Sequence, residues 1–154
     1  MSIEDDIAVF EKVPTLRMLG RGALRILAIG AESRYVHSGE VLFSAGETAD
    51  GAFVIQEGKL SLSTQPAGGG RELTVGPLTL LGELALVAET TRPVTATALE
   101  PSTVLRIPRP LFLKMLEGYP DAALKLRHVL TSRISESERD MERIRDVLGG
   151  PGET

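Results

Sequence analysis

One segment of the sequence combines residue types that can bind an anion. Gly82 opens it, Glu83 follows directly, and Arg92 comes ten residues after the glycine. A short helix that begins near Gly82 directs free backbone N–H groups, such as those of Leu84 and Ala85, toward an anion. Arg92 offers a planar guanidinium whose geometry suits two phosphate oxygens. The spacing therefore predicts a phosphate site between the first turn of this helix and Arg92.

Glu83 and Pro93 limit the binding of a plain phosphate at this site. Glu83 repels a phosphate unless it accepts a hydrogen bond from another part of the ligand, so it lowers the affinity for plain phosphate or sulfate. The structural alternative is an ion pair between Glu83 and Arg92 that closes the loop. Pro93 follows the arginine and has no N–H to donate to a phosphate oxygen.

The elements that must position these residues follow from the hydrophobic periodicity. Residues 1–30 carry apolar side chains at helical spacing, interrupted by Pro14 and Gly20, and predict two or three short helices. Residues 33–107 contain short runs of Val, Leu, Ile and Thr between turn residues, which predicts an antiparallel sandwich or roll.

Within the predicted roll, two local connections are expected. Residues 52–55 and 59–64 are predicted to pair as a tight hairpin, with Gly58 supplying a positive φ. The run Gly68-Gly69-Gly70 lacks the Gly-Lys-Ser/Thr ending of a phosphate-binding loop and is predicted to be a flexible hairpin loop.

Residues 110–148 return to helical character. After Pro120 a long helix is predicted over 121–148, followed by a stop at Gly149-Gly150-Pro151-Gly152. Its apolar seam is narrow and flanked by mixed charges, which predicts pairing with another helix, hence a homodimer or a protein partner; the alternative is a helix packed on its own domain. The seam comprises Ala123, Arg127, Leu130, Ile134, Ser137, Met141, Ile144 and Leu148.

Composition limits the remaining classes of function. The chain has 154 residues, which predicts a single domain over 1–148 and a flexible tail at 149–154. A formal net charge of −4 disfavours direct DNA binding. The absence of cysteine, with only His37 and His128 as histidines, predicts no metal site, no cofactor and no catalytic residues. No apolar run is long enough for a membrane span, so a cytoplasmic protein is expected.

Residues 81–98 resemble the phosphate-binding cassette of the cyclic nucleotide-binding domain family. Further family features appear in the expected order: Gly39-Glu40-Val41-Leu42-Phe43, Gly46-Glu47, and Phe53-Val54-Ile55 with Gly58. The resemblance implies an α+β fold in which N-terminal helices and a long C-terminal helix flank an antiparallel β-roll of the double-stranded β-helix (jelly-roll) type. The cassette would span 82–94.

The resemblance also implies a ligand, cAMP in preference to cGMP. Its site would be formed by Gly82, Glu83, Leu84, Ala85, Arg92, Pro93 and Val94. Glu83 would accept a hydrogen bond from the ribose 2′-hydroxyl, and Pro93 lacks the hydroxyl that holds guanine in cGMP-selective relatives. A residue of the C-terminal helix would cap the base, with Leu126, Leu130, Arg133 and Ile134 as candidates.

Three other readings stay open. The chain could be the sensor domain of a Crp/Fnr-type transcriptional regulator without its DNA-binding part. It could be a nucleotide-free interaction domain of the same fold, with Glu83 paired to Arg92. A metal-dependent enzyme with a cupin-like roll ranks last, because two histidines are too few for the usual ligand set.

Overall fold

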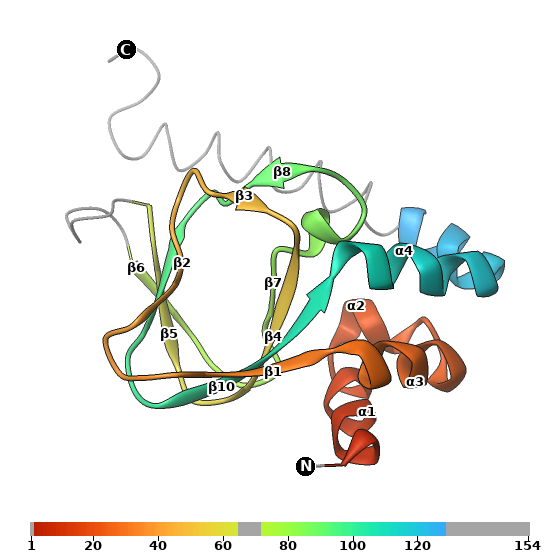
Figure 1. Cartoon of the computed structure of the whole chain (residues 1–154), viewed down its shortest axis with the longest axis horizontal. Coiled ribbons are helices and arrows are strands. Elements are labelled where there is room, and N and C mark those ends of the chain that lie inside the picture. Colours follow the sequence, from red (N-terminus) through yellow and green to blue (C-terminus); the bar gives the residue numbers. More distant parts are fainter. Residues whose placement is uncertain (1, 65–71, 129–154) are drawn as a thin grey trace, which may run out of the picture.

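The α-helices and the strands occupy separate parts of the molecule (Figure 1). The structure is a computed structural model that describes residues 2–64 and 72–128. Four helices gather on one side of the strands: α1 (Ile3–Glu11), α2 (Pro14–Arg17), α3 (Arg21–Gly30) and α4 (Arg109–Gly118). A further helical segment begins at Pro120 and continues to the last described residue, His128.

Local sequence signals set the ends of the N-terminal helices. Ser2 caps α1 through a capping box with Asp5, and Pro14 occupies the first position of α2, where its missing N–H has no intrahelical partner to lose. Gly20 precedes α3 with a φ of 89°, a conformation that favours glycine. The predicted short helices within residues 1–30 are therefore confirmed.

The strands form an antiparallel roll, as predicted. One four-stranded sheet of the described residues has the order β1-β10-β4-β7, a second has the order β2-β9-β5-β6, and β3 pairs with β8. The mixed α+β fold is thus confirmed. The strands are β1 (Glu32–Val36), β2 (Val41–Phe43), β3 (Thr48–Ala49), β4 (Gly51–Glu57), β5 (Leu60–Ser63), β6 (Glu72–Val75), β7 (Leu80–Leu81), β8 (Thr90–Thr91), β9 (Thr95–Ala98) and β10 (Ser102–Pro108).

The predicted hairpin between residues 52–55 and 59–64 is wrong. Strands β4 and β5 lie in different sheets, with β10 beside β4 and β9 beside β5. Gly58 does adopt the expected positive φ, 98°, but it forms the corner at which the chain leaves one sheet for the other. A Cβ atom there would overlap the side chain of Ser102, so glycine permits the close approach of the two corners.

A hairpin forms one strand later. β5 pairs with β6 in antiparallel register, Leu60 opposite Val75. The glycine run predicted to connect them lies within 65–71, outside the described residues.

Alternate residues of β4 enter two separate cores. Ala52 and Val54 face the helices, whereas Phe53 and Ile55 face the interior of the roll. The core inside the roll, called the roll core below, contains Val36, Phe43, Phe53, Ile55, Leu60, Leu81, Ala96, Ala98 and Val104. The core between the helices and the sheet, called the helix-side core, contains Ile7, Phe10, Val13, Leu16, Leu19, Ala23, Leu24, Leu27, Ala28, Ala52, Val54, Leu86, Leu105, Ile107, Phe112, Met115, Ala122 and Leu126.

The start of the predicted long helix packs against the other helices. Leu126, a candidate for capping a base, is a buried member of the helix-side core, because the apolar face of this segment packs on the helical bundle. Of the predicted seam, Ala123 is half-buried and Arg127 is exposed. The seam from Leu130 onward, the candidate Arg133 and the tail at 149–154 lie outside the described residues. Within residues 2–64 and 72–128, no helix is both apolar and long enough to cross a membrane.

Candidate functional site

Gly82 and the turn after it form the first part of the site. Gly82 has a φ of 82° in the left-handed region and precedes a 3₁₀ helix, η1 (Glu83–Leu86). The helical turn predicted at this point is present. However, the N–H of Ala85 donates to the carbonyl of Gly82 at 2.9 Å, so the expectation that this amide is free is wrong. The Ala85 side chain is buried and Leu84 is exposed.

Arg92 forms the second part, and its side chain is only 5% exposed. Its guanidinium carbon lies 4.5 Å from the ring centre of Phe43 and 5.3 Å from that of Phe53. Among the described residues, Nε and Nη1 of Arg92 have no hydrogen-bond partner. A buried donor without a partner costs about 1–3 kcal/mol. This position is therefore suited to an anionic ligand that supplies the missing acceptors.

Gly82 and Arg92 are in direct contact. A Cβ atom at position 82 would overlap Nη1 of Arg92, so the absence of a side chain leaves the space that the guanidinium occupies. The two residues that the sequence spacing linked are thus brought together by the fold.

Backbone hydrogen bonds fix the direction of the Arg92 side chain. The N–H of Arg92 donates to the carbonyl of Glu47, and the N–H of Gly46 donates to the carbonyl of Arg92, each at 2.8 Å. Strands β3 and β8 pair just beside these bonds. Pro93 is exposed, and Val94 packs against the roll core. The strand after the arginine, predicted from its β-branched residues, is β9.

Burial lowers the pKa of the Arg92 guanidinium, and the carboxylates of Asp50 and Glu47 oppose that shift. Asp50 itself forms an ion pair with Arg106, with 2.8 Å between Oδ2 and Nη2. Its pKa is lowered: burial acts in the opposite direction, but the hydrogen bond and charge of Arg106, with a contribution from Arg92, outweigh it. The two carboxylates compensate part of the positive charge that Arg92 carries into the roll.

Glu83 contacts a residue that the sequence did not indicate. Its Oε2 accepts a hydrogen bond of 3.0 Å from Oγ1 of Thr15, a buried residue of α2. The alternative of an ion pair between Glu83 and Arg92 is not formed in the part of the chain that the structure describes. No local sequence signal links two residues that lie 68 positions apart.

Arg109 also reaches this region unexpectedly. Its Nη1 donates to the carbonyls of Ala49, Ala85 and Ala88, at 3.1, 3.3 and 2.9 Å. It thereby ties the first residue of α4 to η1 and β3. One feature of the sequence could have indicated this contact. Arg109 is a cation at the N-terminus of a helix, where it interacts unfavourably with the helix dipole, so an interaction elsewhere could be expected.

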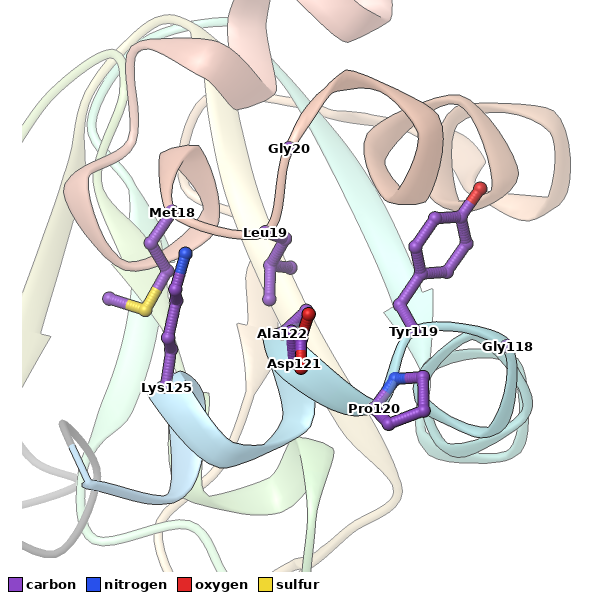
Figure 2. Close-up of a pocket in the computed structure, with 9 residues that line it drawn as sticks. All are labelled: Met18, Leu19, Gly20, Gly118, Tyr119, Pro120, Asp121, Ala122 and Lys125. Atoms are coloured by element: carbon purple, nitrogen blue, oxygen red, sulfur yellow. The ribbon is translucent and has the colours of Figure 1, made fainter.

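A separate pocket of about 380 Å³ lies outside the roll, where the α2–α3 turn meets the end of α4 (Figure 2). Figure 2 shows Met18 and Lys125 on one side of it and Tyr119 on the other. It contains none of the predicted site residues. The pocket is lined by Met18, Leu19, Gly20, Gly118, Tyr119, Pro120, Asp121, Ala122 and Lys125. Nowhere in the described ranges do three His, Asp or Glu side chains gather in a way that could hold a metal ion.

Comparison with known proteins identifies the family and the fold. Residues 33–119, more than half of the chain, match the family described as "Cyclic nucleotide-binding domain". The chain belongs to this family. The match contains Gly82, Glu83 and Arg92, and their assignment to a phosphate-binding cassette stays a prediction.

Several solved structures are similar in fold to this chain. A cyclic nucleotide-binding-like protein from Brucella abortus is 38% identical, with a TM-score of 0.66, and the match covers 73% of this chain and 98% of that one. The N-terminal domain of a transcriptional regulator from Streptomyces coelicolor is 28% identical, with a TM-score of 0.72 and coverage of 86% and 94%. The regulatory domain of Toxoplasma gondii PKA with cAMP, 22% identical over 80% of this chain and 46% of that one, shares the fold with a TM-score of 0.69.

The curated relatives are much larger proteins. Lysophospholipase NTE1 from Chaetomium globosum is 27% identical over 101 residues, which is 64% of this chain and 7% of that protein. Neuropathy target esterase sws from Drosophila persimilis is 29% identical over 121 residues, or 77% and 8%. The chain thus spans less than a tenth of their length. The expectation that this chain has no catalytic residues stays a prediction.

Proposed function

We propose that this chain is a cytoplasmic sensor that binds cAMP, with cGMP as the weaker ligand. The observation that carries the proposal is Arg92, a buried cation with two donors that lack partners among the described residues, in contact with Gly82 of the cassette. A cyclic nucleotide carries a single negative charge on its phosphodiester, which matches one guanidinium.

Five of the seven predicted site residues then have a role in binding or selectivity. Arg92 pairs with the phosphodiester, and Gly82 leaves room for the guanidinium at that point. Glu83 accepts a hydrogen bond from the ribose 2′-hydroxyl, and the Leu84 amide is the donor at the start of η1, since the Ala85 amide is used within the turn. Pro93 provides neither an N–H nor a hydroxyl, which favours adenine over guanine in the ligand.

Signalling runs from the cassette to the C-terminal helices. Arg109 connects η1 to the start of α4, so a ligand that repositions η1 also acts on α4 and on the helix that follows Pro120. Such coupling requires that the nucleotide bind two arrangements of these helices with different affinity. The output is a homodimer contact or a protein partner on the helix predicted over 121–148.

Calorimetric titration with cAMP and cGMP side by side tests the proposal. We expect binding of both, tighter for cAMP, and a loss of about 2–5 kcal/mol in Arg92→Ala, as for truncation of one partner of a desolvated charge pair. Arg25→Ala is the matched control, because Arg25 is an exposed arginine of α3 that pairs with Glu4. Its affinity should equal that of the unmodified protein.

Thermal unfolding provides an independent measurement. At about 100 times its dissociation constant, a ligand stabilises a fold by roughly 2.7 kcal/mol. The absence of both heat and a melting shift with either nucleotide at millimolar concentration removes the proposal and leaves the nucleotide-free interaction domain. Unchanged affinity in Arg92→Ala would show that the phosphate binds elsewhere.

A second candidate is the sensor domain of a transcriptional regulator. The Streptomyces coelicolor relative, 28% identical over 86% of this chain, is such an N-terminal domain. The open reading frame in the genome decides between the two candidates: a helix-turn-helix segment encoded downstream of this sequence supports the regulator, and an effector of another class contradicts it.

A further inference from the structure

Thr15 reaches the cassette from the helical side of the molecule. It follows Pro14 in the first turn of α2 and is 3% exposed. Its hydroxyl donates to Oε2 of Glu83 over 3.0 Å, across 68 positions of sequence. Leu16 beside it is fully buried in the helix-side core. The hydroxyl is therefore held by a packed bundle and has little freedom to move.

We propose that Thr15 is a positioning residue of the nucleotide site, which holds the Glu83 carboxylate for the ribose 2′-hydroxyl and so sets the preference for ribose over 2′-deoxyribose. This inference rests on the proposed function. An ionised carboxylate offers about four lone-pair sites, so a hydrogen bond from Thr15 to one oxygen leaves acceptors for a ligand hydroxyl.

The benefit of this bond is preorganisation. Glu83 is half-buried, and a carboxylate already held by a hydrogen bond loses less side-chain freedom when the nucleotide binds than one that is not held. Threonine suits the task because its β-branched side chain is stiff at χ1 and its position here is packed on all sides. The contact also makes α2 part of the nucleotide site, although α2 lies far from the cassette in the sequence.

The test compares Thr15→Val, which keeps the shape but cannot donate, with Thr15→Ser, which keeps the hydroxyl. Each protein is titrated calorimetrically with cAMP and with 2′-deoxy-cAMP. We expect Thr15→Val to weaken cAMP binding about three- to tenfold, the size of one hydrogen bond, and to leave 2′-deoxy-cAMP binding unchanged. Thr15→Ser should keep the discrimination of the unmodified protein. In a Glu83→Ala background, Thr15→Val should have no further effect on either ligand.

Three results with Thr15→Val overturn the proposal. Equal weakening of both ligands would give Thr15 a merely structural role. Tighter cAMP binding in Thr15→Val would show that Thr15 competes with the ribose. Unchanged discrimination in Thr15→Val, with cAMP still bound, would remove Thr15 from the site and leave the proposed function intact, whereas absence of binding in the unmodified protein overturns both. If Thr15→Val does not fold, Thr15→Ala measured against Thr15→Ser gives the same comparison.

Discussion

The two cores of this molecule share strands but are built differently. β4 and β10 contribute alternate residues to both: Val54 and Leu105 belong to the helix-side core, and Phe53 and Val104 belong to the roll core. The helix-side core consists of apolar side chains from helices and strands that close on one another. The roll core places the rings of Phe43 and Phe53 against the guanidinium of Arg92.

The helix-side core stabilises the fold, whereas the roll core is suited to binding a ligand. Apolar burial in the helix-side core stabilises the fold by about 25 cal/mol per Å². Arg92 lies against the roll core. Burial disfavours the charged form of its guanidinium, and Nε and Nη1 lack hydrogen-bond partners among the described residues. Such a group is unfavourable for the fold alone and favourable once an anion is bound. The two cores should therefore respond oppositely to substitution.

The largest effect is expected from Leu24→Ala. Leu24 is buried in α3 within the helix-side core, and removal of its side chain leaves a cavity that costs about 2–5 kcal/mol. Urea unfolding monitored by circular dichroism measures this loss. The matched control is Ile29→Ala on the same helix, where the side chain is 61% exposed and the change should stay within about 0.5 kcal/mol. Equal losses in both variants would break the comparison, because Leu24 would then contribute no more than a surface residue.

An effect of opposite sign is expected from Arg92→Met without ligand. The substitution removes the buried charge and its two unpartnered donors, and it keeps an unbranched side chain against Phe43 and Phe53. The loss of the cation–π contacts offsets part of the gain. We expect a net gain of about 1 kcal/mol, which raises the melting temperature by about 2–4 °C in a chain of this size. A melting temperature below that of the unmodified protein would mean that Arg92 supports the fold.

Local features of the fold could be predicted from the sequence better than pairings between distant strands. Several local features were predicted correctly: the turn at Gly82, the proximity of Arg92 to Gly82 and the short N-terminal helices all follow from local patterns. The hairpin after β4 failed because a positive φ at Gly58 fits a corner between sheets as well as a tight turn. The choice depends on β9 and β10, which lie some forty residues further along the chain.

Contacts made by side chains from distant elements were not predicted from the sequence. Thr15 contacts Glu83 through the packing of α2 under η1, and Arg109 contacts the η1 carbonyls from the start of α4. Neither residue belongs to a motif, and the contacts of both with η1 become visible only when the helices are placed on the roll. The predicted seam ran through Ala123 and Arg127, whereas the structure buries Ala122 and Leu126 of this segment. Helical spacing alone did not show which face packs on the helix-side core, or that Leu126, a candidate lid, is a core residue.

The smallest effect is expected at the edge of the roll core, in Asp50→Asn. Asp50 is 65% exposed, so its pair with Arg106 contributes less than about 1 kcal/mol. Because its pKa is lower in the folded protein than in the unfolded chain, where it is about 3.9, the contribution is present at neutral pH and is lost as the pH falls through the folded value. Urea unfolding at pH 7 and pH 3 should thus show a deficit for Asp50→Asn at pH 7 that narrows at pH 3. A deficit of the same size at both pH values would mean that the Asp50 charge contributes nothing, and that Arg92 lies in the roll without compensation from this carboxylate.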